Sequence, residues 1–174
     1  MNTPFVKVID KQKKEVPSQV ISKTGKHFEI VFQADVPSFA VHIYAVVPSE
    51  EQCQIETDLK ISGHTLENSK YKVKKKKNGD LAFLFDKELN RQLISAPIKL
   101  AMLHDTGSLA YPSWELRKED IDKEAYCYAN TPEFEIIENG PARIAMKITR
   151  EAEYSTITQI VSLYPDSKVI RVDN

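Results

Sequence analysis

The sequence is poor in the residues that mark several protein classes. It contains two cysteines, Cys53 and Cys127, in 174 residues. Neither belongs to a Cys-x-x-Cys pair, which excludes a cysteine-rich framework and a zinc ribbon. One disulfide remains an alternative, but two free thiols in a reducing cytoplasm fit this cysteine usage better. We therefore expect a cytoplasmic protein, most simply a bacterial one.

Long apolar runs and an excess of one charge are also missing. No apolar run approaches the about 20 residues that cross a bilayer, and the first residues, MNTPFVKVIDKQKK, lack the apolar stretch of a signal peptide. We predict neither a transmembrane helix nor a secretory signal. With 24 basic and 25 acidic side chains, the formal net charge is -1, so nucleic-acid binding would need a local basic patch.

What the sequence does contain is a period of two. Short runs rich in β-branched and aromatic residues alternate with polar residues and end at prolines or polar clusters, as in strands. The predicted strands lie in FVKVID, HFEIVFQADV, FAVHIYAVVP, KLAMLHD, FEIIENG, ARIAMKITRE, STITQIVSLY and KVIRVDN. Asn139-Gly140-Pro141 predicts a hairpin turn, and only WELRKEDIDKEAY could form a helical turn. The pattern predicts an all-β protein, an antiparallel β-sandwich.

A run of four lysines, Lys74–Lys77, precedes Asn78-Gly79 and an apolar stretch. Asn-Gly predicts a hairpin with a type I′ turn, and alternation places Leu81, Phe83 and Phe85 on one face of the returning strand. We expect exposed lysines and a buried Phe83 or Phe85. A polyanion site is the alternative, but no aromatic residue interleaves the lysines, so a solvated edge strand is the preferred interpretation.

The segment around this hairpin, TLENSKYKVKKKKNGDLAFLFDKELNRQLI, resembles the start of the large β domain of glycoside hydrolase family 38 α-mannosidases. The family's Leu-Glu-Asn, aromatic, Asn-Gly and Asp-Lys-Glu positions correspond here to Leu66–Asn68, Tyr71, Asn78-Gly79 and Asp86–Glu88. VIDKQKKEVPSQV, FQADVPSFAVHIYAV and LHDTGSLAYPSWEL are similar to other family segments. In the last of these, Tyr111 stands where the family has a tryptophan, and Pro112-Ser113 stands where it has Asp-Ala.

The resemblance implies a non-catalytic portion of a retaining, zinc-dependent α-mannosidase that hydrolyses terminal α-mannosides. Family enzymes carry the zinc ion and the aspartate nucleophile on an N-terminal α/β barrel, so neither a catalytic nor a metal-binding residue is expected in this chain. The barrel of the same parent chain would be its partner and a mannoside or oligosaccharide the substrate, with no nucleic acid and no membrane.

The same resemblance implies how the chain is divided. Residues 1–48 would form a small β domain, and residues 49–63, which are polar and contain a glycine, are predicted to be a linker with room for one strand. Residues 64–174 would form the first part of a supersandwich of the galactose-mutarotase type.

Other residues could carry chemistry by type alone. A retaining glycosidase needs two carboxylates about 5 Å apart, but loop solvation is the simpler interpretation of four of the five acids near the predicted helical turn. Those acids are Asp105, Glu115, Glu119, Asp120 and Asp122. No zinc-ligand spacing joins the four histidines, and no Gly-x-Ser-x-Gly elbow supports a serine nucleophile. The histidines are His27, His42, His64 and His104.

The stretch AYPSWE supplies the candidate site residues: Tyr111, Trp114 and Glu115. Rings can stack on the apolar faces of a sugar while a carboxylate accepts hydroxyl hydrogens, so these residues would border a substrate cleft or a domain interface. That Trp114 instead anchors the core remains open. The second functional hypothesis is a stand-alone carbohydrate-binding β-sandwich module.

Overall fold

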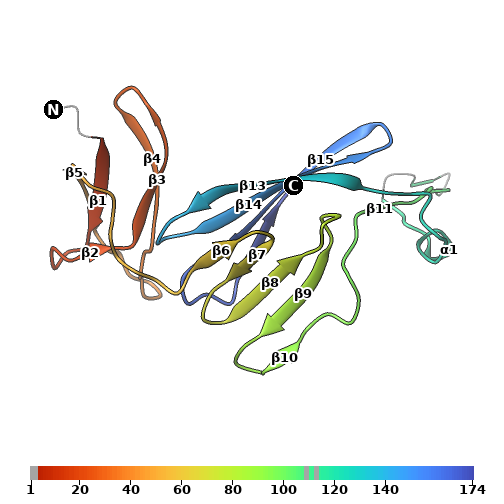
Figure 1. Cartoon of the computed structure of the whole chain (residues 1–174), viewed down its shortest axis with the longest axis horizontal. Coiled ribbons are helices and arrows are strands. Elements are labelled where there is room, and N and C mark those ends of the chain that lie inside the picture. The colour runs from red at the N-terminus through yellow and green to blue at the C-terminus, as the bar shows by residue number, and fades with distance from the viewer. Residues whose placement is uncertain (1–3, 108–109, 112–113) are drawn as a thin grey trace.

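The computed structural model describes residues 4–107, 110–111 and 114–174. Within them the chain forms strands β1 to β16 and one four-residue helix, α1 (Lys118–Ile121), and every pair of neighbouring strands is antiparallel. The predicted all-β class is confirmed, and the expected helical turn is α1. The molecule is elongated, with β1 to β5 at one end and β11 and α1 at the other (Figure 1). No helix among the described residues has the length and apolar character that a bilayer crossing requires.

The first 50 residues form two small sheets. The strands are β1 (Phe5–Ile9), β2 (Glu15–Val16), β3 (Ser18–Thr24), β4 (His27–Phe32) and β5 (Ala45–Ser49). One sheet has the order β2-β1-β5, and β3 and β4 form a hairpin. Pro48 is accommodated inside β5, opposite Val6, because β5 is an edge strand. The strand predicted over residues 39–48 starts only at Ala45, where pairing with β1 begins, and β3 was not predicted.

Two larger sheets pack face to face in the rest of the chain. The first has the order β10-β9-β8-β7-β6 and the second the order β13-β14-β15-β16. Their strands are β6 (Lys60–Ser62), β7 (Thr65–Glu67), β8 (Tyr71–Lys75), β9 (Leu81–Asp86), β10 (Arg91–Gln92), β13 (Asn130–Asn139), β14 (Ile144–Ala152), β15 (Ser155–Leu163) and β16 (Ile170–Asp173). A further pair, β11 (Ala101–Met102) and β12 (Cys127–Tyr128), stands apart. β6 lies inside the predicted linker, and the predicted domain boundaries stay predictions.

The main hydrophobic core lies between these two sheets. β7 and β8 contribute Leu66 and Val73, and β14 and β15 contribute the larger share. The fully buried members are Leu66, Val73, Ile144, Met146, Ile148, Val161 and Leu163. Each such side chain contributes about 1.5–3 kcal/mol by leaving water. The predicted turn at Asn139-Gly140-Pro141 joins β13 to β14 and is confirmed, with the Gly140 N–H donating to the Arg143 carbonyl.

The lysine hairpin forms, but its turn is not of type I′. The Gly79 N–H donates to the Lys76 carbonyl at 2.9 Å, and Gly79 has a φ of 87°, whereas Asn78 keeps a negative φ. A type I′ turn needs positive φ at both central positions. Here Asn78 acts through its side chain instead, because its amide donates to the Asp80 carboxylate at 2.9 Å.

The prediction that Phe83 or Phe85 is buried is wrong. Lys74 pairs with Phe83 and Lys75 with Leu81, so Ala82 is an extra residue that forms a β-bulge. Leu81 and Leu84 therefore pack against the core. Phe83 and Phe85 stay half-buried on the outer face, where their rings stack on each other at 5.9 Å and the Lys74 ammonium lies over the Phe83 ring.

Lys75 is also not exposed as predicted, since it is half-buried beside Arg150. Burial, reinforced by the Arg150 charge, lowers the pKa of the Lys75 ammonium from 10.5 to about 8. Between about pH 8 and pH 10.5 the unfolded chain thus binds more protons than the folded chain at this residue, and the free energy of unfolding rises with pH.

We expect the melting temperature of the wild type to rise relative to that of Lys75→Met as the pH rises from about 8 to about 10. Lys77→Met removes a lysine that is exposed. Its melting temperature should therefore change with pH in the same way as that of the wild type. Differential scanning calorimetry of the three proteins at several pH values makes the comparison. Parallel profiles for the wild type and Lys75→Met would contradict the lowered pKa.

One side chain fastens the first strands to the large sheet. The Gln19 carbonyl oxygen accepts the N–H groups of Ala142 and Arg143, and its amide donates to Glu138 at 2.8 Å. Glu138 also receives a bidentate contact from the Arg143 guanidinium. Position 140 must be glycine for this contact, because a Cβ there would lie 2.1 Å from the Gln19 carbonyl oxygen. A cavity of about 290 Å³ adjoins this junction.

Candidate functional site

The predicted site residues lie between β11 and α1, at the end of the molecule far from β1 (Figure 1). Pro112 and Ser113, on which the family comparison of this stretch partly rests, lie outside the described residues. The N–H groups of Trp114 and Glu115 both donate to the Tyr111 carbonyl, at 3.2 and 3.1 Å. These two hydrogen bonds hold Trp114 and Glu115 close to Tyr111.

The two rings form a surface pair. The centroids of Tyr111 and Trp114 are 6.3 Å apart, and the ring planes differ by 14°. Trp114 is 88% exposed and Tyr111 61%, so Trp114 does not anchor the core of this chain. Glu115 beside them is exposed as well. Two nearly parallel, exposed rings next to a carboxylate could stack on one sugar face and bind its hydroxyl groups.

A buried aspartate holds the base of this loop. The Asp120 carboxylate is 1% exposed and accepts the N–H and the hydroxyl of Thr106, at 3.0 and 2.7 Å. The Lys123 ammonium lies 2.7 Å from its other oxygen. The Lys123 ammonium and the Thr106 hydrogen bonds hold the pKa of the Asp120 carboxyl well below its usual range. Asp120 is therefore a charged structural residue and no proton donor near neutral pH.

The remaining acids considered from the sequence have surroundings that differ from those of Asp120. Asp122 pairs with Lys118 at 2.8 Å, and Asp105 accepts the Gly107 N–H at 2.7 Å. Glu115 and Glu119 are exposed. Each of these acids thus has a partner of its own or faces solvent.

The histidines are likewise separate from one another. The His64 ring stacks on Phe134 at 3.9 Å, and the His104 ring stacks on Tyr126 at 4.2 Å. In residues 4–107, 110–111 and 114–174, the His, Cys, Asp and Glu side chains form no group of three that could hold a metal ion. These residues therefore do not fit a zinc site, which needs three or four converging ligands.

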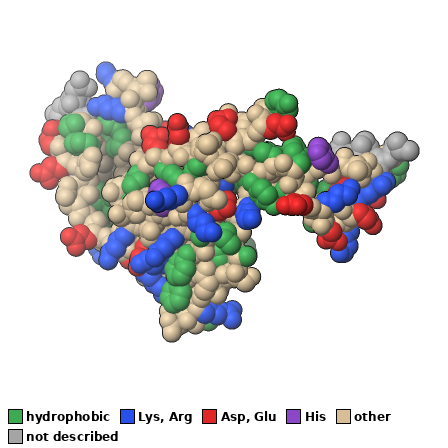
Figure 2. All heavy atoms as spheres, turned by 45° about the vertical axis from the view of Figure 1, so that its right-hand side comes forward, with side chains coloured by type: hydrophobic (Ala, Val, Ile, Leu, Met, Phe, Trp, Pro, Cys, Tyr) green, Lys and Arg blue, Asp and Glu red, His purple; other side chains and the backbone are tan. Residues whose placement is uncertain are grey.

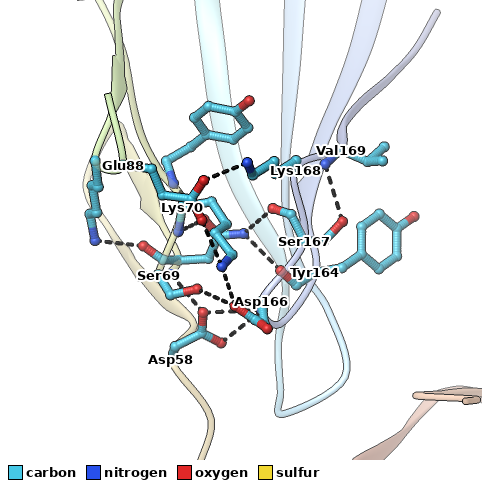
Figure 3. Close-up of polar contacts among 12 residues, drawn as sticks. Asp58, Ser69, Lys70, Glu88, Tyr164, Asp166, Ser167, Lys168 and Val169 are labelled. Atoms are coloured by element: carbon cyan, nitrogen blue, oxygen red, sulfur yellow. Dashed lines mark hydrogen bonds and ion pairs between the residues drawn. The ribbon is translucent and has the colours of Figure 1, made fainter. Parts of the chain in front are cut away.

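Two of the motif positions, Asn68 and Glu88, lie in one cluster of polar contacts that sequence reasoning missed (Figure 3), whereas Asn78-Gly79 follows the opposite end of β8. Asn68 is fully buried, and its amide donates to the carbonyls of Tyr164 and Ser167 at 2.9 and 2.8 Å. Its carbonyl accepts the N–H groups of Lys70 and Tyr71 at 3.0 and 2.7 Å. All four hydrogen-bonding positions of this amide are used, so Asn68 fastens the β7–β8 turn to the β15–β16 loop.

Charged residues surround Asn68 at the surface. The Lys70 ammonium lies 2.9 Å from both Glu88 and Asp166, and Lys168 also pairs with Glu88. Hydrogen bonds to Glu88 and Asp166 raise the pKa of Lys70. Asp58 accepts the Ser69 N–H at 2.6 Å. Exposed pairs of this kind contribute little stability each, so the buried amide is the main contact between these loops.

Two lysines at the other end of the hairpin from the four-lysine run are paired with an acid. Lys72 and Lys87 pair with Glu67 at 3.0 and 2.8 Å. Figure 2 shows basic side chains beside hydrophobic ones on the lower part of the visible face, with acidic side chains elsewhere on it.

Comparisons with known proteins place the fold. The family model described as "Glycosyl hydrolases family 38 C-terminal domain" matches residues 66–174. Among solved structures, the chain is similar to an alpha-mannosidase from Enterococcus faecalis V583, with a TM-score of 0.59 and 16% sequence identity. That match covers 98% of this chain and 24% of the other, so this chain spans about a quarter of its length. No curated protein matches the sequence.

Proposed function

We propose that this chain, which belongs to glycosyl hydrolase family 38, is the non-catalytic β-sandwich portion of a larger enzyme: a retaining, zinc-dependent α-mannosidase that hydrolyses terminal α-mannosides. The observation that carries this proposal is the family match over residues 66–174. The fold likeness to about a quarter of a solved alpha-mannosidase supports it. A cytoplasmic location and a mutarotase-type supersandwich are part of the same proposal.

In this proposal the chemistry is divided between two parts of one polypeptide. The zinc ion and the aspartate nucleophile belong to a catalytic barrel outside these 174 residues, and the ion would polarise the substrate. The residues of this chain contribute packing against the barrel and a border for the sugar site. Tyr111 and Trp114 would stack on a mannose ring, while Glu115 would accept hydrogen bonds from its hydroxyl groups.

The decisive experiment compares the 174-residue chain with the longer polypeptide that contains it. Hydrolysis of an aryl α-mannoside in the presence of zinc should occur only with the longer protein. Turnover by the 174-residue chain that disappears in Asp105→Asn or Glu115→Gln would show that this chain carries catalytic groups. Absence of mannosidase activity from the longer protein would overturn the assigned reaction.

A stand-alone carbohydrate-binding module is the second candidate, because the stacked pair of Tyr111 and Trp114 is exposed. Trp114 is the only tryptophan in the sequence, so tryptophan emission reports on this loop directly. Titration of the 174-residue chain with methyl α-mannoside should leave the emission unchanged if the sugar site needs the barrel. A saturable change would favour the module.

Trp114→Ala in the longer enzyme should lower kcat/KM about tenfold, since the stacking contribution of one ring is about 1.4 kcal/mol at the upper end. Its melting temperature should hardly change, because substitutions at exposed positions typically stay within about 0.5 kcal/mol. Tyr154→Ala removes a ring that is 93% exposed at the β14–β15 turn and serves as the matched control. Unchanged kinetics in Trp114→Ala would remove this loop from the sugar site.

A further inference from the structure

A 14-residue segment, VPSFAVHIYAVVPS over residues 36–49, contains no Asp, Glu, Lys or Arg, in a chain that is 28% charged. Most of its large apolar side chains point into solvent. Phe39 is fully exposed, and Val41 and Ile43 are 90% and 75% exposed. Val36 and Val46 are about half exposed. We call residues 36–49 the uncharged segment.

The backbone of the uncharged segment is strained at Phe39, its most exposed side chain. Phe39 has a φ of 57°, in the left-handed region, which is unfavourable for any residue with a bulky side chain. Glycine or asparagine would occupy that conformation at lower cost. Because the Phe39 ring is fully exposed, no packing within the described chain compensates for this strain.

The base of the segment is nonetheless held in place. The Tyr44 hydroxyl accepts the Asp35 N–H at 2.9 Å and donates to the Asp35 carbonyl at 3.2 Å. The Tyr44 ring packs against Phe32, with centroids 5.1 Å apart. These contacts join Tyr44 to Asp35 and Phe32, which lie just before the segment. The exposed apolar side chains between them are therefore held on an anchored loop.

The accessible surface of the whole chain is larger than that of a compact monomer, and the excess is enough to contact a large partner. The accessible surface is 11818 Å², whereas a compact monomer of 19.8 kDa exposes about 8,600 Å². The excess exceeds the about 1,600 Å² that a standard stable interface buries on both partners together. The similar alpha-mannosidase chain is about four times longer, which supplies polypeptide to cover such a surface.

We propose that the uncharged segment docks onto an apolar, uncharged face of the remaining part of the parent polypeptide, with Phe39 inserted into that face. The absence of charge is typical of the buried centre of an interface. This inference rests on the proposed function. It concerns a surface distinct from Tyr111 and Trp114, because the sheet of β5 and the loop before α1 lie at opposite ends of the molecule (Figure 1).

Phe39→Asn tests the inference, because it should change the melting temperatures of the 174-residue chain and of the longer polypeptide in different ways. In the 174-residue chain, the substitution relieves left-handed strain and removes no contact, so the melting temperature should stay the same or rise. In the longer polypeptide it removes the inserted ring, and the melting temperature should fall by at least about 2 °C. Tyr154→Asn, at another exposed aromatic position, should change neither protein.

A melting temperature that stays the same or rises in both proteins would overturn the proposal, as would a fall in the 174-residue chain. Sedimentation of the 174-residue chain tests whether a second copy of the chain covers the segment instead. A dimer that dissociates in Phe39→Asn would also overturn the proposal. Mannosidase activity is assayed separately on the longer polypeptide. A fall in melting temperature in an inactive longer protein supports the docking surface and rejects only the assigned reaction.

Discussion

Asp80→Ala should lower the free energy of unfolding by about 3–5 kcal/mol, because it leaves a buried guanidinium without its carboxylate. Arg150 is 2% exposed and Asp80 is 5% exposed. One terminal nitrogen of Arg150 lies 3.2 Å from the Asp80 carboxylate, and the other donates to the Gln159 carbonyl oxygen. The Arg150 Nε has no hydrogen-bond partner within the described part of the chain, and burial lowers the pKa of Arg150.

The double variant Asp80→Ala with Arg150→Met is the matched control. Replacing a buried ion pair by apolar residues is often nearly neutral, so the double variant should recover most of the loss. Urea titration gives both free energies, provided that the slope with urea concentration stays constant. A double variant that is less stable than Asp80→Ala would mean that Arg150 stabilises the fold by packing and not through its charge partner.

Asn68→Ala should cost about 2–4 kcal/mol. It removes four hydrogen bonds, and buried backbone groups left without partners cost about 1–3 kcal/mol each, less where water can reach them. Ser69→Ala, next in the chain, removes only exposed side-chain contacts, to Asp166 and Asp58, and should cost under about 0.5 kcal/mol. Equal losses in the two variants, measured by urea titration, would contradict the role assigned to the buried amide.

Local patterns of the sequence were enough for the class and for most long strands. Asn139-Gly140 formed the predicted turn because a hairpin turn depends mainly on its own residues. The alternation rule failed at β9, where the extra residue Ala82 exchanges the two faces beyond it. Phe83 and Phe85 therefore face outward, and nothing in the alternation marks the position of such a bulge.

Other features depend on contacts that no local pattern encodes. The partners of Asn68 lie 96 and 99 residues further along the chain, so its burial could not be read from Leu-Glu-Asn alone. The strand predicted from residue 39 fails over residues 39–44 because no neighbouring strand pairs with them, although their residue types suit a sheet. Tyr111, Trp114 and Glu115 were placed near one another by their short spacing, while the exposure of Trp114 required the structure.

The contacts of Asn68 also form late in protein synthesis, because its partners lie far along the chain. At about 5–20 residues per second, the ribosome reaches Tyr164 and Ser167 roughly 5–20 s after it has added Asn68. During that interval β7 and β8 have been synthesised, but the strands that cover Leu66 and Val73 are incomplete. The apolar face of the first sheet is therefore open to chaperones, or to another nascent chain, until β15 emerges.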